Sequence, residues 1–106
     1  FSPIGQKGWY SKNGKRAYFD QQPIEVSSIV QALAIAHKIT KNKEYVNKAS
    51  KAFSWFLGRN MINHSLYNPV TGGCYDGLGE NTININQGAE STVSYLLARL
   101  TLDGMI

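Results

Sequence analysis

Apolar residues repeated at spacings of three and four mark three amphipathic helices, and this periodicity limits the fold more than any other feature of the sequence. The first helix is expected to begin at Pro23 and to run to about residue 39, because proline fits the first turn of a helix. The second is expected over residues 42–58, with an asparagine as its N-cap and a glycine as its stop. The last is expected to run from Asn86, its N-cap, to Leu100.

Each predicted helix has one apolar face that has to be buried. The expected faces are Val26, Ile29, Val30, Leu33, Ala36 and His37 in the first helix, Tyr45, Ala49, Ala52, Phe53, Phe56 and Leu57 in the second, and Ala89, Val93, Leu96, Leu97 and Leu100 in the third. The first two helices predict an αα-hairpin, which leaves the third without a hairpin partner. We therefore expect an all-α fold in which antiparallel helical hairpins form part of an (α/α) toroid or solenoid.

The segments outside the helices have turn-forming sequences. Residues 8–19 place aromatic arms around Asn13-Gly14, which predicts a short N-terminal β-hairpin. The asparagine- and glycine-rich stretch that follows the second helix predicts a long ordered loop without a further regular element. The expected organisation of the single domain fragment, residues 1–106, is a hairpin and loop over 1–20, the αα-hairpin over 21–58, the long loop over 59–85 and the final helix over 86–106.

Composition excludes several classes of protein. The single cysteine, Cys74, rules out an internal disulfide framework and is expected to be a buried thiol. The two histidines are far apart in the sequence, so we expect no metal site, and no motif requires a cofactor. The net charge of +4 comes from cations that lie apart from the aromatic residues, which argues against a nucleic-acid partner. No apolar run reaches about 18 residues, so we expect no membrane span and a soluble, cytoplasmic chain.

Candidate functional groups lie in the loops and in the first turns of the helices. Asp20 and Glu25 flank the start of the first helix, Asp76 lies in the long loop, and Glu90 lies in the first turn of the last helix. If the two helices direct their N-termini toward one cavity, these carboxylates surround it and can bind hydroxyls or act as general acids and bases. The alternative for the two glutamates is that they only stabilise helix N-termini. The aromatic residues expected around the same cavity, where they would stack on sugar rings, are Trp9, Tyr10, Tyr67 and Tyr75.

Four stretches of the sequence resemble a known family. They are Phe19-Asp-Gln-Gln-Pro-Ile-Glu25, Trp55-Phe-Leu-Gly-Arg-Asn60, Leu66-Tyr-Asn-Pro-Val-Thr-Gly-Gly-Cys-Tyr-Asp-Gly-Leu78 and Asn84-Ile-Asn-Gln-Gly-Ala-Glu-Ser-Thr92. In this order they resemble the C-terminal region of a family of bacterial glycosyltransferases, in which a domain of the six-hairpin, (α/α)6 toroid type follows or accompanies the transferase. The resemblance covers essentially residues 8–100.

The resemblance implies a carbohydrate-handling module whose polar motifs line the mouth of the toroid. Asp20 and Glu90 are then expected to act as acid/base groups or as sugar-hydroxyl contacts, with Asp76 as a supporting carboxylate. The expected partners are a carbohydrate substrate and the remainder of the parent chain. The expected substrate-binding residues are Glu25, Trp9, Tyr67, Tyr75, Asn86 and Gln87.

Two other functions stay open from the sequence. A noncatalytic packing or interaction module would use its carboxylates and asparagines as caps and turn formers, and would leave no open acidic pocket. A six-hairpin glycoside hydrolase would need two carboxylates about 5.5 Å apart for retention, or roughly 6.5–9.5 Å apart for inversion. Toroids host hydrolases, lyases, epimerases and binding modules, so the fold alone does not choose among them.

Overall fold

The computed structural model describes residues 1–10 and 14–106, and within them the chain is mostly helical. Three α-helices pack against one another: α1 (Pro23–Thr40), α2 (Glu44–Phe53) and α3 (Ala89–Met105). The 3₁₀-helix η1 (Ser54–Leu57) continues α2, and β1 (Gly77–Leu78) pairs with β2 (Ile83–Asn84) in a two-stranded antiparallel sheet. None of these described helices is both long enough and apolar enough to cross a membrane.

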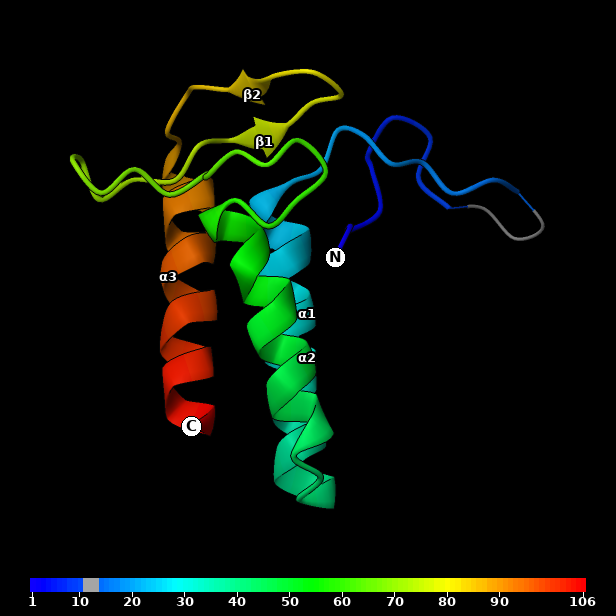
Figure 1. The fold of residues 1–106 in the computed structure, drawn as a ribbon, viewed down its shortest axis with the longest axis vertical. Coiled ribbons are helices and arrows are strands. Elements are labelled where there is room, and N and C mark those ends of the chain that lie inside the picture. The colour runs from blue at the N-terminus through cyan, green and yellow to red at the C-terminus, as the bar shows by residue number, and fades with distance from the viewer. Residues whose placement is uncertain (11–13) are drawn as a thin grey trace.

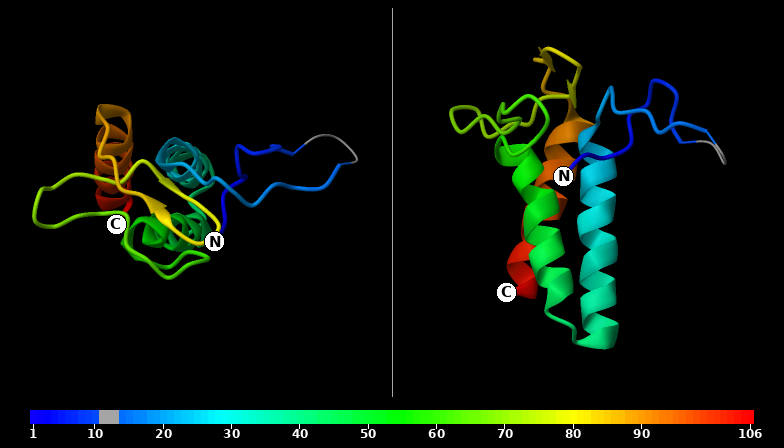
Figure 2. Two further views of the ribbon diagram at one scale, coloured as in Figure 1. Left: turned by 90° about the horizontal axis from the view of Figure 1, so that it is seen from above. Right: turned by 45° about the vertical axis from the view of Figure 1, so that its right-hand side comes forward.

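The loops gather at one end of the helices. α1 and α3 run in the same direction and α2 runs against them, so the N-terminal ends of α1 and α3 lie beside the end of η1 (Figure 1). Seen from above, the sheet lies over these helix ends and the N-terminal segment extends to one side (Figure 2). We call this end of the molecule the loop end.

α1 begins where the sequence predicts and ends close to the predicted position. Gln22 is extended (φ −120°, ψ 145°), and Pro23 occupies the first turn, where its missing N–H is not needed. After Thr40 the chain turns at Lys41, which has a left-handed conformation (φ 59°) and donates its N–H to the carbonyl of His37 at 2.8 Å. A single left-handed residue of this kind is a common way to end a helix.

α2 also follows its local signals. The N-cap is Lys43 and not the expected Asn42, whose side chain nevertheless accepts the backbone N–H of Glu44 at 3.0 Å. The last turn tightens into η1, and Gly58 ends it with φ 109°, a conformation that glycine adopts without steric cost. α1 and α2 thus form the antiparallel pair that the sequence predicts.

Gln21 is a fully buried polar residue that joins three parts of the molecule. Its side-chain oxygen accepts the indole N–H of Trp55, also fully buried, at 2.8 Å. Its backbone exchanges two hydrogen bonds with Leu78 of β1, at 2.9 and 2.8 Å. The segment before α1 is therefore tied to η1 and to the sheet, and Trp55 is a packing residue as expected.

The core lies between the three helices and under the loop end. Aromatic rings form its centre: Phe56 packs edge-on to Tyr95 with the ring centroids 5.4 Å apart, and Phe53 lies 5.6 Å from both. α1 contributes Val26 and Val30, in agreement with the predicted stripe. The remaining buried apolar residues are Ala49, Ala52, Trp55, Leu66, Cys74, Leu78, Ile83, Ala98 and Leu102.

α3 departs from the prediction at both ends. Asn86, the expected N-cap, precedes the helix, which starts at Ala89 after the extended residue Gly88 (φ −71°, ψ 160°). The helix then continues past Leu100 to Met105, because Leu102 is buried and Met105 packs against the core. The predicted start was wrong because the stabilising carboxylate comes from a distant loop residue, described below.

The predicted buried face of α3 was also wrong. Val93, Leu96, Leu97 and Leu100 are 47–60% exposed. The inward face instead carries Ser91, Ser94, Tyr95, Ala98 and Leu102. Small side chains on this face let α3 pack closely on α1, and Tyr95 stacks on Tyr67 with the ring centroids 4.6 Å apart. Close approach and aromatic stacking thus override the apolar periodicity, and the outer face of α3 is left apolar and uncovered within the described residues.

Two loop predictions also differ from the structure. Part of the turn expected at Asn13-Gly14 lies outside the described residues, and the described flanks of that turn form no strand. Backbone bonds nevertheless link these flanks, with Ala17 donating to the Trp9 carbonyl and accepting the Gly5 N–H, both at 2.8 Å. The long loop over 59–85 does contain a regular element, because the β1–β2 sheet lies within it.

Replacing Trp55 with phenylalanine tests the buried junction. The substitution leaves the side-chain oxygen of Gln21 without its donor and opens a void, so we expect the free energy of unfolding to fall by about 2–3 kcal/mol. Urea unfolding followed by far-UV circular dichroism measures it. Trp9→Phe is the matched control, because Trp9 is half-exposed and its replacement should cost no more than about 0.5 kcal/mol. Equal losses in the two variants would contradict the assignment.

Candidate functional site

A polar cavity of about 430 Å³ lies at the loop end. Three segments that are distant in sequence form its wall: the N-terminal segment, the residues just before α1, and the β1–β2 sheet with its turn. We call it the loop-end cavity. Its lining includes Gln6, Lys7, Asp20, Gln22, Asp76 and residues 79–84.

Backbone bonds place Asp20 and Lys7 on one side of the cavity. Gln6 donates its N–H to the carbonyl of Asp20 at 2.9 Å, and Lys7 donates to the carbonyl of Phe19 at 3.0 Å. The Lys7 ammonium then lies 3.7 Å from the Asp20 carboxylate. Because the Lys7 side chain is 73% exposed, water screens this ion pair, and the carboxylate stays accessible to another partner.

Asp76 supports the wall and the start of α3 together. Its side-chain oxygen accepts the backbone N–H of Gly88 at 2.7 Å, and its own N–H donates to the carbonyl of Asn86 at 2.8 Å. A Cβ atom on Gly88 would lie 2.9 Å from the same carboxylate oxygen, so a larger residue there would have to displace the Asp76 side chain. The negative charge of Asp76 near the N-terminus of α3 also opposes the positive end of the helix dipole.

The turn between β1 and β2 supplies the outer wall. Gly79 donates its N–H to the carbonyl of Thr82 at 2.8 Å, which closes the turn, and the side chains of Glu80, Asn81 and Thr82 are exposed on it. Sequence reasoning placed Glu80 in a loop and missed it as a cavity residue. The signal that was available is the Gly79-Glu-Asn-Thr82 turn between two short apolar stretches.

Hydrogen-bond acceptors dominate the cavity. Asp20, Asp76 and Glu80 contribute three carboxylates against the one ammonium of Lys7, and the lining also includes the amides of Gln6, Gln22, Asn81 and Asn84. In the described part of the chain, no group of three or more acidic, histidine or cysteine side chains is arranged to hold a metal ion. Carboxylates and side-chain amides of this kind can each form a hydrogen bond to a hydroxyl.

The structure brings together two of the four carboxylates predicted to share a cavity. Asp20 and Asp76 both line the loop-end cavity. The N-terminal ends of α1 and α3 lie at the same end of the molecule, yet Glu25 and Glu90 in their first turns are not part of the lining. Glu25 is half-buried and Glu90 is exposed.

The predicted aromatic platforms lie outside the cavity lining. Trp9 is half-exposed on the N-terminal segment. Tyr67 stacks on Tyr95, with 13° between the ring planes, so one of its faces is covered. Tyr75 is half-buried against the core, and its hydroxyl accepts the side-chain N–H of Asn68 at 3.3 Å. Among the predicted aromatic residues, Tyr10 and Trp9 have the most open surface, with 58% and 50% exposed.

Asn86 and Gln87 shape the approach to α3. The N–H of Asn86 donates to the side chain of Asn84 at 3.2 Å, and the Gln87 side-chain oxygen accepts the hydroxyl of Thr71 at 2.7 Å. Both residues are exposed. Their described contacts thus hold the loop in place, which is the use that the packing-module alternative expects of such residues.

Cys74 is the buried thiol that the sequence predicts. It is fully buried, and this burial, together with the negative charge of Asp76, raises the pKa of its thiol to about 12. The Cys74 thiol therefore stays protonated near neutral pH. A protonated and inaccessible thiol is a poor nucleophile, so the chemistry of the loop end has to come from other groups.

No protein-family model matches the sequence, and no curated protein shows a significant match to it. The loop-end cavity contains parts of three of the four sequence motifs, through Asp20 and Gln22 in the first, Asp76 in the third and Asn84 in the fourth.

Replacing Asp76 with alanine tests its role at the start of α3. The variant loses the acceptor for the Gly88 N–H and a charge beside the helix N-terminus, so we expect the free energy of unfolding to fall by about 1–2 kcal/mol. Asp103→Ala is the matched control. Asp103 is exposed near the other end of α3 in a long 3.9 Å ion pair, and its removal should cost less than about 0.5 kcal/mol. Chemical denaturation of the two variants gives the comparison, and equal losses would rule out the assigned role.

Proposed function

We propose that this chain is a helical module of a larger glycosyltransferase-type protein and that its loop end handles saccharides. The observation that supports this most strongly is the loop-end cavity, in which Asp20 from the segment before α1 comes together with Asp76 and Glu80 of the β1–β2 hairpin. The four motifs that resemble the glycosyltransferase family provide the second support. The complete toroid belongs to the proposal, with α1 and α2 as one of its hairpins.

The chemistry of the cavity matches a saccharide better than other small molecules. A pyranose carries many hydroxyls that donate and accept hydrogen bonds, and carboxylates and amides satisfy both roles. A phosphate group would be repelled by three carboxylates that face only one lysine. The volume of about 430 Å³ also falls within the range of about 300–1,000 Å³ that is common for small-molecule sites.

The cavity residues take different parts in this proposal. Asp20 is the acid/base or hydroxyl-binding candidate, since its only ion-pair partner in the described residues is the exposed Lys7. Asp76 is the supporting carboxylate, because it already holds Gly88. Glu80 on the β1–β2 turn adds a contact at the rim. Trp9, on the same segment as Lys7, provides the open aromatic face for stacking.

Saccharide titration tests the site directly. We expect mono- or oligosaccharides to shift the backbone amide resonances of residues 79–84, and Asp20→Asn to weaken this binding about tenfold because a charge-assisted hydrogen bond is lost. Glu80→Gln should have a smaller effect at the more exposed rim. Two-dimensional NMR titration of the wild type and both variants supplies the measurement.

Glu44→Gln is the matched control for these variants, because Glu44 lies at the opposite end of the molecule in the first turn of α2. The Glu44→Gln variant should bind the saccharide with the same affinity as the wild type. Glu90→Gln separately tests the sequence-based expectation for Glu90, which lies outside the cavity lining. The proposal would be wrong if Asp20→Asn left the saccharide affinity unchanged, or if neither this chain nor its parent protein bound saccharides.

The outer face of α3 supports the helical-array part of the proposal. Val93, Leu96, Leu97 and Leu100 form an uncharged stripe that is more apolar than the buried face of the same helix. A helix that is apolar on both sides normally packs against neighbours on both sides. We propose that further helices of the parent chain cover this stripe, as successive hairpins do in a toroid.

A noncatalytic packing module is the second candidate function. It is favoured by the use of Asp76, Asn86 and Gln87 in contacts that hold the loop and the start of α3. The same outer face of α3 would then be the main functional surface. The open acidic cavity with Asp20 argues against this candidate, which predicts that the carboxylates are all engaged by backbone groups.

Substitution on the outer face of α3 tests its role as a covered surface. Leu96→Gln combined with Leu100→Gln should leave the unfolding free energy of this chain within about 1 kcal/mol and reduce its binding of a hydrophobic dye. In the longer parent protein, the same pair should destabilise by more than about 2 kcal/mol. Leu102→Gln is the buried control and should destabilise both forms. If the double substitution lowers the unfolding free energy of the parent protein no more than that of this chain, no further helix covers this face.

A further inference from the structure

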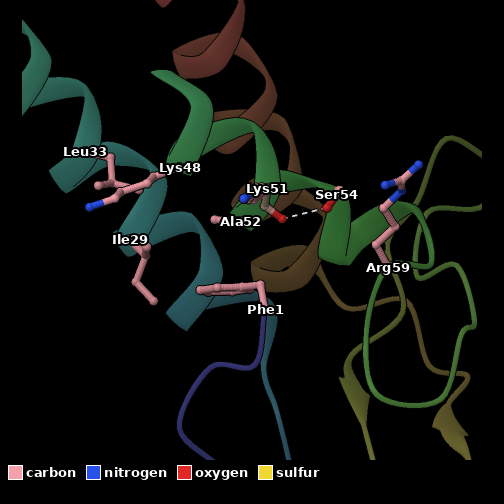
Figure 3. A pocket seen from close by; sticks show the side chains of 8 residues that line it. All are labelled: Phe1, Ile29, Leu33, Lys48, Lys51, Ala52, Ser54 and Arg59. Carbon is pink, nitrogen blue, oxygen red and sulfur yellow. Dashed lines mark hydrogen bonds between the residues drawn. The ribbon is translucent and has the colours of Figure 1, made fainter. Parts of the chain in front are cut away.

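A second cavity, of about 610 Å³, lies between α1 and α2, away from the loop-end cavity and sharing no residue with it. Its floor is apolar. Ile29 and Leu33 contribute from consecutive turns of α1, Ala52 contributes from α2, and the ring of Phe1 lies across one side (Figure 3). We call it the α1–α2 groove.

Cations border this apolar floor. Lys48, Lys51 and Arg59 all line the groove and are exposed, and no carboxylate is among its described lining residues. The ion pairs found in the described residues join Lys7 to Asp20 and Arg99 to Asp103, so they engage none of the three groove cations. The groove is thus an apolar channel with an uncompensated positive edge.

The three cations follow one another along the groove and do not converge on one point (Figure 3). Lys48 and Lys51 lie on neighbouring positions of the α2 surface, about 4.5 Å apart along the helix axis, and Arg59 follows the end of η1. A single small anion would need cations that point to one place. A row of cations matches a ligand that presents negative charges at successive positions.

We infer that the α1–α2 groove binds an amphipathic helix whose apolar stripe is flanked by aspartate or glutamate, supplied by a protein partner. Its apolar side chains would lie on Ile29 and Leu33, with Ala52 allowing a close approach because it is small. Its carboxylates would face Lys48, Lys51 and Arg59. This site is independent of the saccharide proposal, because it uses other residues on another face.

The test uses two synthetic helical peptides of about 15 residues with the same leucine and alanine stripe, one flanked by glutamates and the other by lysines. Fluorescence anisotropy at low and high salt measures their binding to the described chain. We expect the acidic peptide to bind at least about tenfold more tightly than the basic one, and the difference to shrink as salt screens the charges. Equal affinity for the two peptides would overturn the inference.

Charge reversal sharpens the test. Lys48→Glu combined with Lys51→Glu should weaken the acidic peptide at least about tenfold and strengthen the basic one. Lys15→Glu combined with Lys38→Glu makes the same change in net charge outside the groove and should keep the wild-type preference. Circular dichroism verifies that both double variants remain folded. Equal weakening by the two pairs would show that net charge, not the groove, controls binding.

Other occupants give distinguishable results. Binding of a fatty acid such as laurate that depends on the groove lysines, without binding of the acidic peptide, would overturn the peptide inference in favour of a small amphiphile. Self-association by sedimentation that Lys48→Glu with Lys51→Glu abolishes would assign the groove to a second copy of this chain. Amide shifts from the acidic peptide that are confined to residues around Ile29, Leu33 and Ala52 would support the inference.

Discussion

The loop end of this molecule depends on one buried amide. Gln21 accepts the indole N–H of Trp55 and pairs through its backbone with Leu78, so the same residue connects the N-terminal segment, η1 and the sheet. Burying the Gln21 side-chain amide without hydrogen-bond partners would cost free energy. The fold in which Trp55 supplies a partner is therefore favoured. Asp20 and Gln22 flank this fixed point, and both consequently face the loop-end cavity. The functional groups at this end are positioned by a polar contact inside the core.

The molecule offers three surfaces of different chemistry. The loop-end cavity is acidic and polar, the α1–α2 groove is apolar with a cationic border, and the outer face of α3 is apolar and uncharged. They lie on different elements, so each can engage its own kind of partner. The proposed place of this chain in a larger protein would use such a division, because one face would join neighbouring helices while another stays open.

Much of the fold could be predicted where the signal is local. Pro23, Asn42 and Gly58 mark helix ends through backbone geometry and side-chain hydrogen bonds that involve only nearby residues. Local signals did not predict the start or the buried face of α3. Its start depends on Asp76, which is far away in the sequence, and its orientation depends on Tyr95 stacking and on the close approach that Ser94 and its small neighbours allow.

At the candidate site, too, some residues could be predicted from local signals and others depend on distant contacts. Asp20 and Asp76 could be predicted to meet, because both precede or accompany helix starts that lie at one end of the molecule. The sequence marks the turn that carries Glu80, but the side of the sheet that this turn faces depends on the β1–β2 register, which a turn signal alone does not give. Tyr67 and Tyr75 were expected at the site because a sequence does not distinguish exposed from packed tyrosines. In the structure both pack against the core.

The bond between Asp76 and the Gly88 N–H closes the β1–β2 excursion at its base. The β1–β2 hairpin lies between these two residues, which hold its two ends together. Residues inserted into or deleted from its turn therefore need not disturb the helices below. Loop closure grows only slowly more costly with length, by about 0.6 kcal/mol for each doubling. We therefore expect the outer wall of the cavity to tolerate changes in length while the scaffold under it stays the same.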